Sequence, residues 1–186
     1  MTLIAQKIYT VEEYFELERH SEVRHEFVYG QLIPMSGESR DANRIALNIY
    51  TMLNPVLEAL GYEIYLHDVK TMVEESGIYR YPDLVATPES DDEDTHVVKK
   101  PVLVAEVVSD STAGVDRGDK LRQYCNIPTL QYYLIIEQDE PQIEMYVRQG
   151  DTWEVRFFDA SDEVIKLDKF EVEISIKSMY RRVKFK

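Results

Sequence analysis

The chain has 186 residues, with 35 Asp or Glu against 21 Lys or Arg and a formal net charge of −14 at pH 7. This length predicts one domain over residues 1–186 that buries a core of its own. The single cysteine, Cys125, excludes an internal disulfide framework and a cysteine-based zinc cluster. No apolar run approaches a membrane span and no signal-peptide pattern opens the chain, so we expect a cytoplasmic protein without membrane contact.

In chain order, the first predicted element is a helix over residues 11–19, introduced by the capping box Thr10–Glu13. A β-hairpin follows over residues 23–35, because Gly30 suits a tight turn between two apolar runs. Ser39 opens a long helix that ends at Leu60, and its apolar residues recur at helical spacing. Residues 62–73 alternate as one long strand does.

Two apolar runs rich in β-branched residues come next, over residues 81–86 and 102–108. The second is almost continuously apolar, which is typical of a strand buried on both faces. A helix over residues 115–124 and a strand over residues 130–136 then complete a right-handed crossover. A hairpin over residues 142–158, a strand over residues 170–176 and a short helix follow. The fold class is therefore α/β, with a mixed β-sheet core flanked by helices and a β-hairpin extension.

Each of the two apolar runs holds one carboxylate, Asp83 at the start of the first and Glu106 inside the second. A carboxylate in a buried strand is costly unless it is paired, protonated or bound to a metal. If the two strands are neighbours, the carboxylates face one point, as they do in sites for hard cations such as Mg²⁺. The alternative is that both residues lie at strand ends, where water solvates them.

A lysine follows 14 positions after Glu106. Asp116, Lys120 and Tyr124 are spaced to share one face of the predicted helix. A helix that follows a strand lies back across the sheet, so Lys120 can approach the two carboxylates and stabilise charge on a phosphate that is being cleaved. The alternative for Lys120 is an ordinary ion pair with Asp116 on a solvated face.

Together these residues resemble the PD-(D/E)xK signature of restriction-endonuclease-like nucleases, and in particular the Uma-type endonuclease family, which is abundant in cyanobacteria. The matching segments are Thr10–Tyr14, His25–Gly30, Tyr81–Asp83, Glu106–Thr112 and Asp116–Tyr124. The resemblance implies a restriction-endonuclease-like fold and a Mg²⁺- or Mn²⁺-dependent endonuclease that acts on DNA. It implies that Asp83 and Glu106 bind the metal and that Lys120 assists the attacking water.

The same resemblance implies that Glu26 is a third active-site carboxylate near the metal. A plain ion pair with Arg24 or Arg19 is the alternative. Two positions depart from the family pattern. The lysine of the wider superfamily normally lies two residues after the glutamate, where this chain has Val108. The resemblance implies that the lysine has moved to the helix, at Lys120, as is usual in this family. Relatives often carry a histidine at the start of the long helix, where this chain has Ala42.

The remaining signals are weaker. The four histidines, His20, His25, His67 and His96, show no metal-ligand spacing. The net charge opposes a nucleic-acid role because DNA phosphates are bound by Lys and Arg, although a bound cation inverts the local charge. A basic patch that includes Arg117, Lys120 and Arg122 is one way to meet that need.

The alternative function is a catalytically silent nuclease fold that binds nucleic acid or protein. A homodimer is expected in either case, since cutting both strands of a duplex often uses two copies related by a two-fold axis.

Overall fold

The computed structural model describes residues 7–75, 77–89, 94–108, 114 and 116–185. Its helices are α1 (Val11–His20), α2 (Arg40–Ala59), α4 (Leu121–Cys125) and α5 (Ile176–Met179), and a π-helical turn over Asp116–Lys120 leads into α4. Its strands are β1 (His25–Val28), β2 (Gln31–Pro34), β3 (Tyr62–Leu66), β4 (Lys70–Glu74), β5 (Ile78–Arg80), β6 (Leu84–Pro88), β7 (Val97–Val98), β8 (Leu103–Val108), β9 (Tyr132–Glu137), β10 (Ile143–Gln149), β11 (Thr152–Phe158), β12 (Val164–Leu167) and β13 (Val172–Ser175). None of the described helices combines the length and the apolar character that a bilayer crossing requires.

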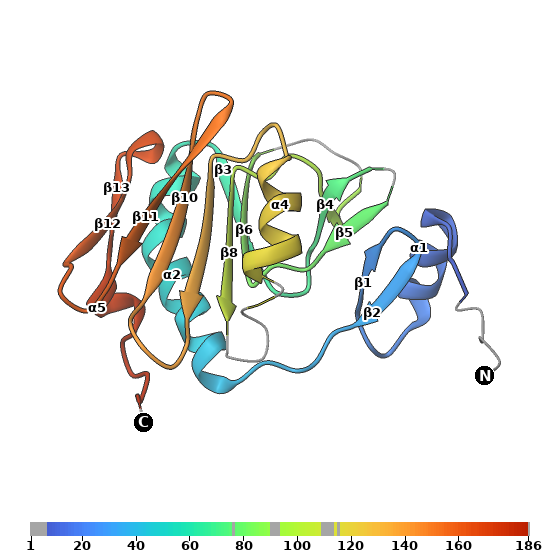
Figure 1. The fold of residues 1–186 in the computed structure, drawn as a ribbon, viewed down its shortest axis with the longest axis horizontal. Helices are drawn as coiled ribbons and strands as arrows, with labels where there is room; N and C mark the ends of the chain where they lie inside the picture. Colours follow the sequence, from blue (N-terminus) through green and yellow to red (C-terminus); the bar gives the residue numbers. More distant parts are fainter. Residues whose placement is uncertain (1–6, 76, 90–93, 109–113, 115, 186) are drawn as a thin grey trace.

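The described strands form a six-stranded sheet, a five-stranded sheet and a two-stranded hairpin (Figure 1). The strand order is β11-β10-β9-β8-β6-β3 in the first and β2-β1-β5-β4-β7 in the second, and β12 pairs with β13. In the six-stranded sheet β8 and β9 are parallel and the other neighbours are antiparallel. The predicted α/β class with a mixed sheet is therefore confirmed, and α4 lies in the connection between the two parallel strands.

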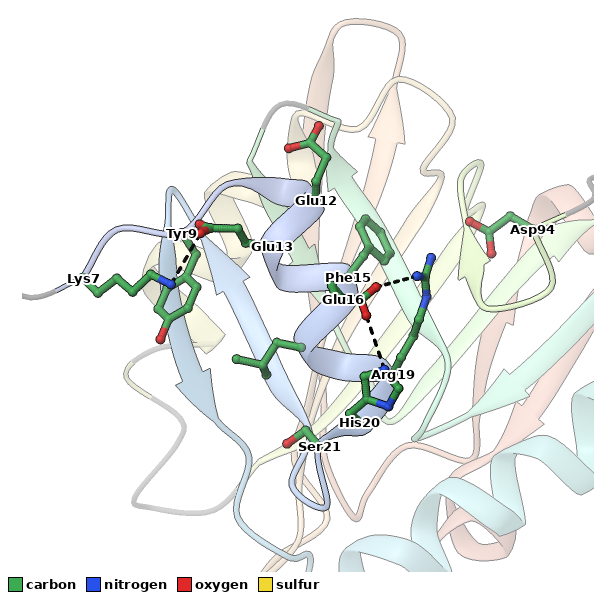
Figure 2. A pocket seen from close by; sticks show the side chains of 11 residues that line it. Lys7, Tyr9, Glu12, Glu13, Phe15, Glu16, Arg19, His20, Ser21 and Asp94 are labelled. Atoms are coloured by element: carbon green, nitrogen blue, oxygen red, sulfur yellow. Dashed lines mark hydrogen bonds and ion pairs between the residues drawn. The ribbon is translucent and has the colours of Figure 1, made fainter.

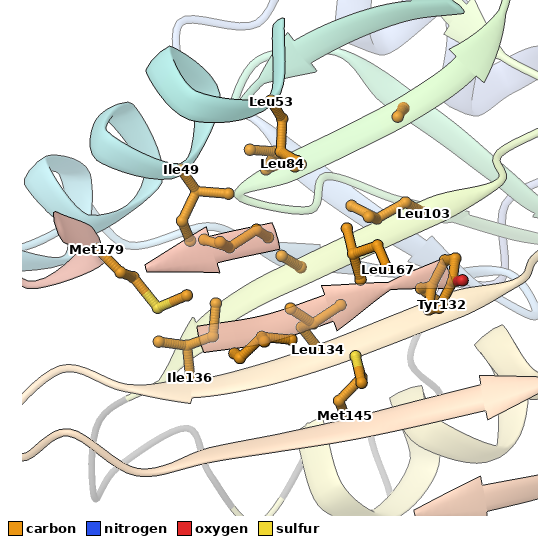
Figure 3. Close-up of a cluster of buried hydrophobic side chains, with 14 of the residues drawn as sticks. Ile49, Leu53, Leu84, Leu103, Tyr132, Leu134, Ile136, Met145, Leu167 and Met179 are labelled. Carbon is orange, nitrogen blue, oxygen red and sulfur yellow. The ribbon is translucent and has the colours of Figure 1, made fainter. Parts of the chain in front are cut away.

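The main core fills the space between the six-stranded sheet and α2 (Figure 3). Ile49 and Leu53 lie one turn apart on the buried side of α2 and contact a layer of sheet side chains that includes Leu84, Leu103 and Leu134. Full burial of each such aliphatic side chain stabilises the fold by about 1.5–3 kcal/mol. This packing fixes β6 beside β8, and Asp83 directly precedes β6 while Glu106 lies in β8.

The opposite face of the same sheet is covered by α4. Val104 and Val108 point to this face, where they belong to a buried cluster with Tyr124 and Tyr133. Side chains alternate along a strand, so Glu106, between these two valines, also faces α4. The carboxylate thus lies under the helix that follows its own strand.

A separate layer is built by α1 and the hairpin of β1 and β2, which Figure 1 shows beside β5 and away from the larger sheet. The predicted capping box is present, with hydrogen bonds in both directions between Thr10 and Glu13. The hairpin turns at Tyr29 and Gly30, whose φ angles of 46° and 87° fit a type I′ turn. Glu26 lies in β1 of this layer, and β1 pairs with β5.

The prediction of one long strand over residues 62–73 is wrong. The chain breaks at His67, whose φ angle of 54° lies in the left-handed region and cannot continue an extended strand. Because of this break, β3 pairs with β6 in one sheet and β4 pairs with β5 in the other. The predicted strand over residues 81–86 also begins later, at Leu84, and the strands β7 and β12 were not predicted.

Candidate active site

Asp83 and Glu106 come together through strand register. Leu84 of β6 pairs with Ala105 of antiparallel β8, so the residue before Leu84 lies opposite the residue after Ala105. The Val107 N–H donates a hydrogen bond of 2.5 Å to Asp83 Oδ2, which fixes that carboxylate against β8. Glu106 is only 4% exposed. It is therefore a buried carboxylate and not a solvated residue at a strand end.

Lys120 joins these carboxylates from the π-helical turn before α4. Its Nζ lies 2.9 Å from Asp116 Oδ1, 3.1 Å from Glu106 Oε1 and 3.7 Å from Glu26 Oε1. The ordinary pair with Asp116 and the approach to Glu106 thus occur together. The Tyr124 hydroxyl also donates to Glu106 Oε1, over 3.0 Å. The predicted shared face of Asp116, Lys120 and Tyr124 is present and points at Glu106.

Glu26 is buried at the edge of the same group, and its cationic partner is Arg80 rather than Arg24 or Arg19. Arg80 Nη1 lies 2.5 Å from Glu26 Oε2. Arg80 is itself buried and donates from Nε and Nη2 to Gln123 Oε1 over 3.2 and 2.7 Å. One oxygen of Glu26 is therefore held by an arginine, and the other faces Lys120.

Two residues that sequence reasoning missed complete the group on its other side. His67 Nδ1 lies 2.7 Å from Glu38 Oε1 and 3.8 Å from Asp83 Oδ1. The ligand atoms of these three residues all lie within 4.8 Å of one another. Their sequence spacing carries no motif. Ala42, where the resemblance to the family implies a histidine, lines the cavity that also holds Glu38 and Asp83.

That cavity has a volume of about 390 Å³, and the candidate residues Glu26, Glu38, Asp83, Glu106, Asp116 and Lys120 line it. A larger hollow of about 1200 Å³ lies over α1 (Figure 2). Its wall shows Glu16 paired with Arg19 and His20, all strongly exposed (Figure 2). Exposed pairs of this kind contribute little. The smaller cavity instead gathers the buried side chains of Glu26, Glu106 and Asp116, so it is the candidate active site.

The pKa values of the ionisable groups in the site are shifted by burial and by their charged neighbours. Burial raises the pKa of Glu106 to about 8; Lys120 opposes this shift, and the neighbouring carboxylates add to it. Burial alone would lower the pKa of Lys120, but the carboxylates of Glu106, Glu26 and Asp116 outweigh it and raise that pKa. The carboxylates of Asp83 and Glu38 beside its ring raise the pKa of His67 to about 10.

Burial opposes ionisation of Asp83, but the neighbouring His67 and Glu38 and the Val107 N–H outweigh it and lower its pKa. Carboxylates outnumber cationic groups in this cavity. Five carboxylates (Glu26, Glu38, Asp83, Glu106 and Asp116) share three positive partners (Arg80, Lys120 and protonated His67). The described side chains of the site thus include more acidic than basic groups.

Comparison with known proteins identifies the family of this chain. Residues 11–178 match the model of the Uma2 family, which is described as "Putative restriction endonuclease". This chain belongs to the Uma2 family.

Two Synechocystis proteins are similar to it: sll1609 is 36% identical over 154 residues, which are 81% of this chain and 87% of the relative. The second, slr1290, is 31% identical over 176 residues, which are 94% of this chain and 92% of the relative.

A solved structure from Anabaena variabilis, titled a putative nuclease belonging to DUF820, shares the fold with a TM-score of 0.75. It is 17% identical, and the match covers 93% of this chain and 98% of that one. The predicted membership of the Uma-type family and the predicted restriction-endonuclease-like fold are thereby confirmed.

The site of this Uma2 protein fits the divalent cation that such a fold implies. Asp83 and Glu106 supply the hard oxygen ligands that Mg²⁺ and Mn²⁺ prefer. The excess of acidic groups in the site and the raised pKa of Glu106 both fit a divalent cation, whose charge would stabilise the ionised carboxylates.

Proposed function

We propose that this protein is a metal-dependent endonuclease that hydrolyses phosphodiester bonds in DNA. The observation that carries the proposal is the convergence of Asp83, Glu106 and Lys120 in one cavity. Mg²⁺ or Mn²⁺ held by Asp83 and Glu106 would supply a Lewis acid for the phosphate and an acidified water. The side chains around Asp83 and Glu106 would carry out the other parts of the chemistry.

Lys120 acts in this proposal as a donor and not as a base, because its raised pKa keeps it protonated at neutral pH. Its ammonium orients the attacking water and stabilises the charge that develops on the phosphate. Tyr124 holds Glu106 Oε1 in place. Glu26, anchored by Arg80, presents its free oxygen to Lys120 and serves as the third carboxylate, as a further metal ligand or by positioning the water.

One observation favours the alternative of a catalytically silent fold that binds nucleic acid or protein. Arg117 is paired with Glu137 and Glu144, and Arg122 is paired with Asp119. Lys120 is buried among carboxylates. These three members of the predicted basic patch therefore offer little free positive charge to a phosphate backbone.

A homodimer remains a prediction of the same proposal. β11 is the last strand of the six-stranded sheet and exposes two apolar side chains, Val155 at 41% and Phe157 at 70%. Such a surface is one that a second copy would cover.

The test is plasmid cleavage by purified protein with Mg²⁺ or Mn²⁺ and with an EDTA control. We expect Asp83→Ala to abolish cleavage and Lys120→Ala to lower turnover by about 10²–10³-fold, the usual cost of a lost charge-stabilising donor. Asp151→Ala, which removes an exposed carboxylate from the β10–β11 turn, is the matched control and should cut normally.

Cleavage by the Asp83→Ala variant would refute the assignment. A wild-type protein that is inactive with both metals would favour the silent binding fold.

A further inference from the structure

The cluster of Glu38, His67 and Asp83 is separate from the lysine side of the cavity. Glu38 precedes α2, His67 follows β3 and Asp83 precedes β6, so three different elements bring these side chains together. His67 Nδ1 is the shared centre, at 2.7 Å from Glu38 Oε1 and 3.8 Å from Asp83 Oδ1. The ion pairs of Lys120 with Glu26, Glu106 and Asp116 lie outside this cluster.

Further contacts hold the potential ligands in position. Asn43 Nδ2 lies 3.0 Å from His67 Nε2, the ring nitrogen that faces away from the carboxylates. The Val107 N–H anchors Asp83 Oδ2 and leaves Oδ1 toward His67. Ligating histidines and carboxylates are normally oriented by such outer hydrogen bonds. With a cation on Nδ1, the opposite nitrogen would carry the ring proton and donate it to the Asn43 amide oxygen after rotation of that amide.

We infer that Glu38, His67 and Asp83 form a second cation position that prefers a first-row transition-metal ion such as Mn²⁺ to Mg²⁺. The preference follows from the imidazole, because nitrogen ligands suit transition metals whereas Mg²⁺ selects oxygen. Asp83 is shared with the position proposed between Asp83 and Glu106. A shared carboxylate is the arrangement that joins the cations of two-metal phosphodiester sites.

This inference rests on the proposed function for the position at Asp83 and Glu106, but its own ligands can be tested without any substrate. The competing explanation is that Glu38 and His67 form an ion pair that ties the start of α2 to the end of β3. An ion pair of that kind would affect stability and would leave metal binding unchanged.

The experiment measures Mn²⁺ and Mg²⁺ binding to the EDTA-treated, dialysed full chain by calorimetry, with bound Mn²⁺ counted by electron paramagnetic resonance. The variants are His67→Gln and Glu38→Gln. Glu38 is partly exposed, so its variant is expected to fold even if the His67 variant does not. His20→Gln is the matched control, because it breaks a histidine–glutamate pair on α1 outside the cavity.

We expect two Mn²⁺ per wild-type chain, bound more tightly than Mg²⁺. His67→Gln and Glu38→Gln should each weaken one Mn²⁺ by about tenfold or more, since loss of even an outer hydrogen bond costs about 10–100-fold in metal affinity. His20→Gln should bind as the wild type does. Glu106→Gln should leave the His67-dependent ion in place.

Unchanged Mn²⁺ binding in both Glu38→Gln and His67→Gln, or equal affinity of the wild type for Mn²⁺ and Mg²⁺, would overturn the inference. Neither result depends on cleavage. A protein that binds two Mn²⁺ as described but never cuts DNA would refute the nuclease and retain the second cation position.

Discussion

Replacement of Glu106 by glutamine tests the electrostatics of the site most directly. Glutamine has the shape of the protonated glutamic acid and cannot ionise. The Tyr124 hydroxyl can still donate to the side-chain oxygen, and Lys120 keeps its contact with Asp116 at 2.9 Å. In the absence of metal, the variant therefore differs from the wild type mainly by the lost charge of one buried carboxylate.

The size and sign of the effect follow from the pKa. In the folded chain the pKa of Glu106 is raised from 4.5 to about 8, so the folded state holds this proton more tightly than the unfolded state does. The free energy of unfolding then falls as pH rises between these two values. At about 1.36 kcal/mol for each pH unit, the loss is at most about 4–5 kcal/mol, and relaxation around Lys120 reduces it.

The assay is urea denaturation of wild type and Glu106→Gln in EDTA at pH 5 and pH 8. We expect stabilities within about 1 kcal/mol of each other at pH 5 and a clearly more stable variant at pH 8. Added Mn²⁺ should stabilise the wild type at pH 8 much more than the variant, because the ionised Glu106 carboxylate binds the cation and a neutral glutamine binds it more weakly. A variant that is less stable than the wild type at pH 8 in EDTA would refute this reasoning.

Two further substitutions test the contacts that build the site. Arg80→Met leaves the Glu26 carboxylate buried without its partner and should cost about 3–5 kcal/mol in urea denaturation, whereas Arg122→Met, which breaks an exposed pair, should cost less than about 1 kcal/mol. Tyr81→Phe removes a buried hydrogen bond of 2.9 Å to Glu18 and should cost about 1–3 kcal/mol. Thermal denaturation should show no comparable loss for Tyr65→Phe, whose bond to Glu63 is exposed. Equal losses in either pair of variants would contradict the assigned burial.

Elements with a local rule were predictable from the sequence. The capping box sets the start of α1, Gly30 with its positive φ sets the first hairpin, and the spacing of Ile49 and Leu53 sets the buried side of α2. The break at His67 has no such rule. A non-glycine residue in the left-handed region is held there by its surroundings, so alternation alone continued the strand through it.

The site divides in the same way. Asp83 and Glu106 stand out because each is the one carboxylate in an apolar run, and Lys120 follows from helical spacing. Arg80 lies 54 residues from Glu26, and His67 lies 29 residues from Glu38. Helical or strand periodicity relates only residues that are close in the sequence, so it cannot predict contacts between residues this far apart. Only the packing of β1 on β5, and of the loop before α2 on β3, brings them within contact.

The position of the lysine has a physical reason in the packing of α4. Val108, two residues after Glu106, points to the same face of β8 and is 1% exposed within the cluster that includes Tyr124 and Tyr133. A lysine there would bury its ammonium among aromatic rings, at a large desolvation cost. The turn before α4 instead extends Lys120 over the carboxylates, where Asp116 pairs with it. The carboxylates and the lysine therefore rest on different elements, and the usual spacing of two residues fails while the three groups still meet.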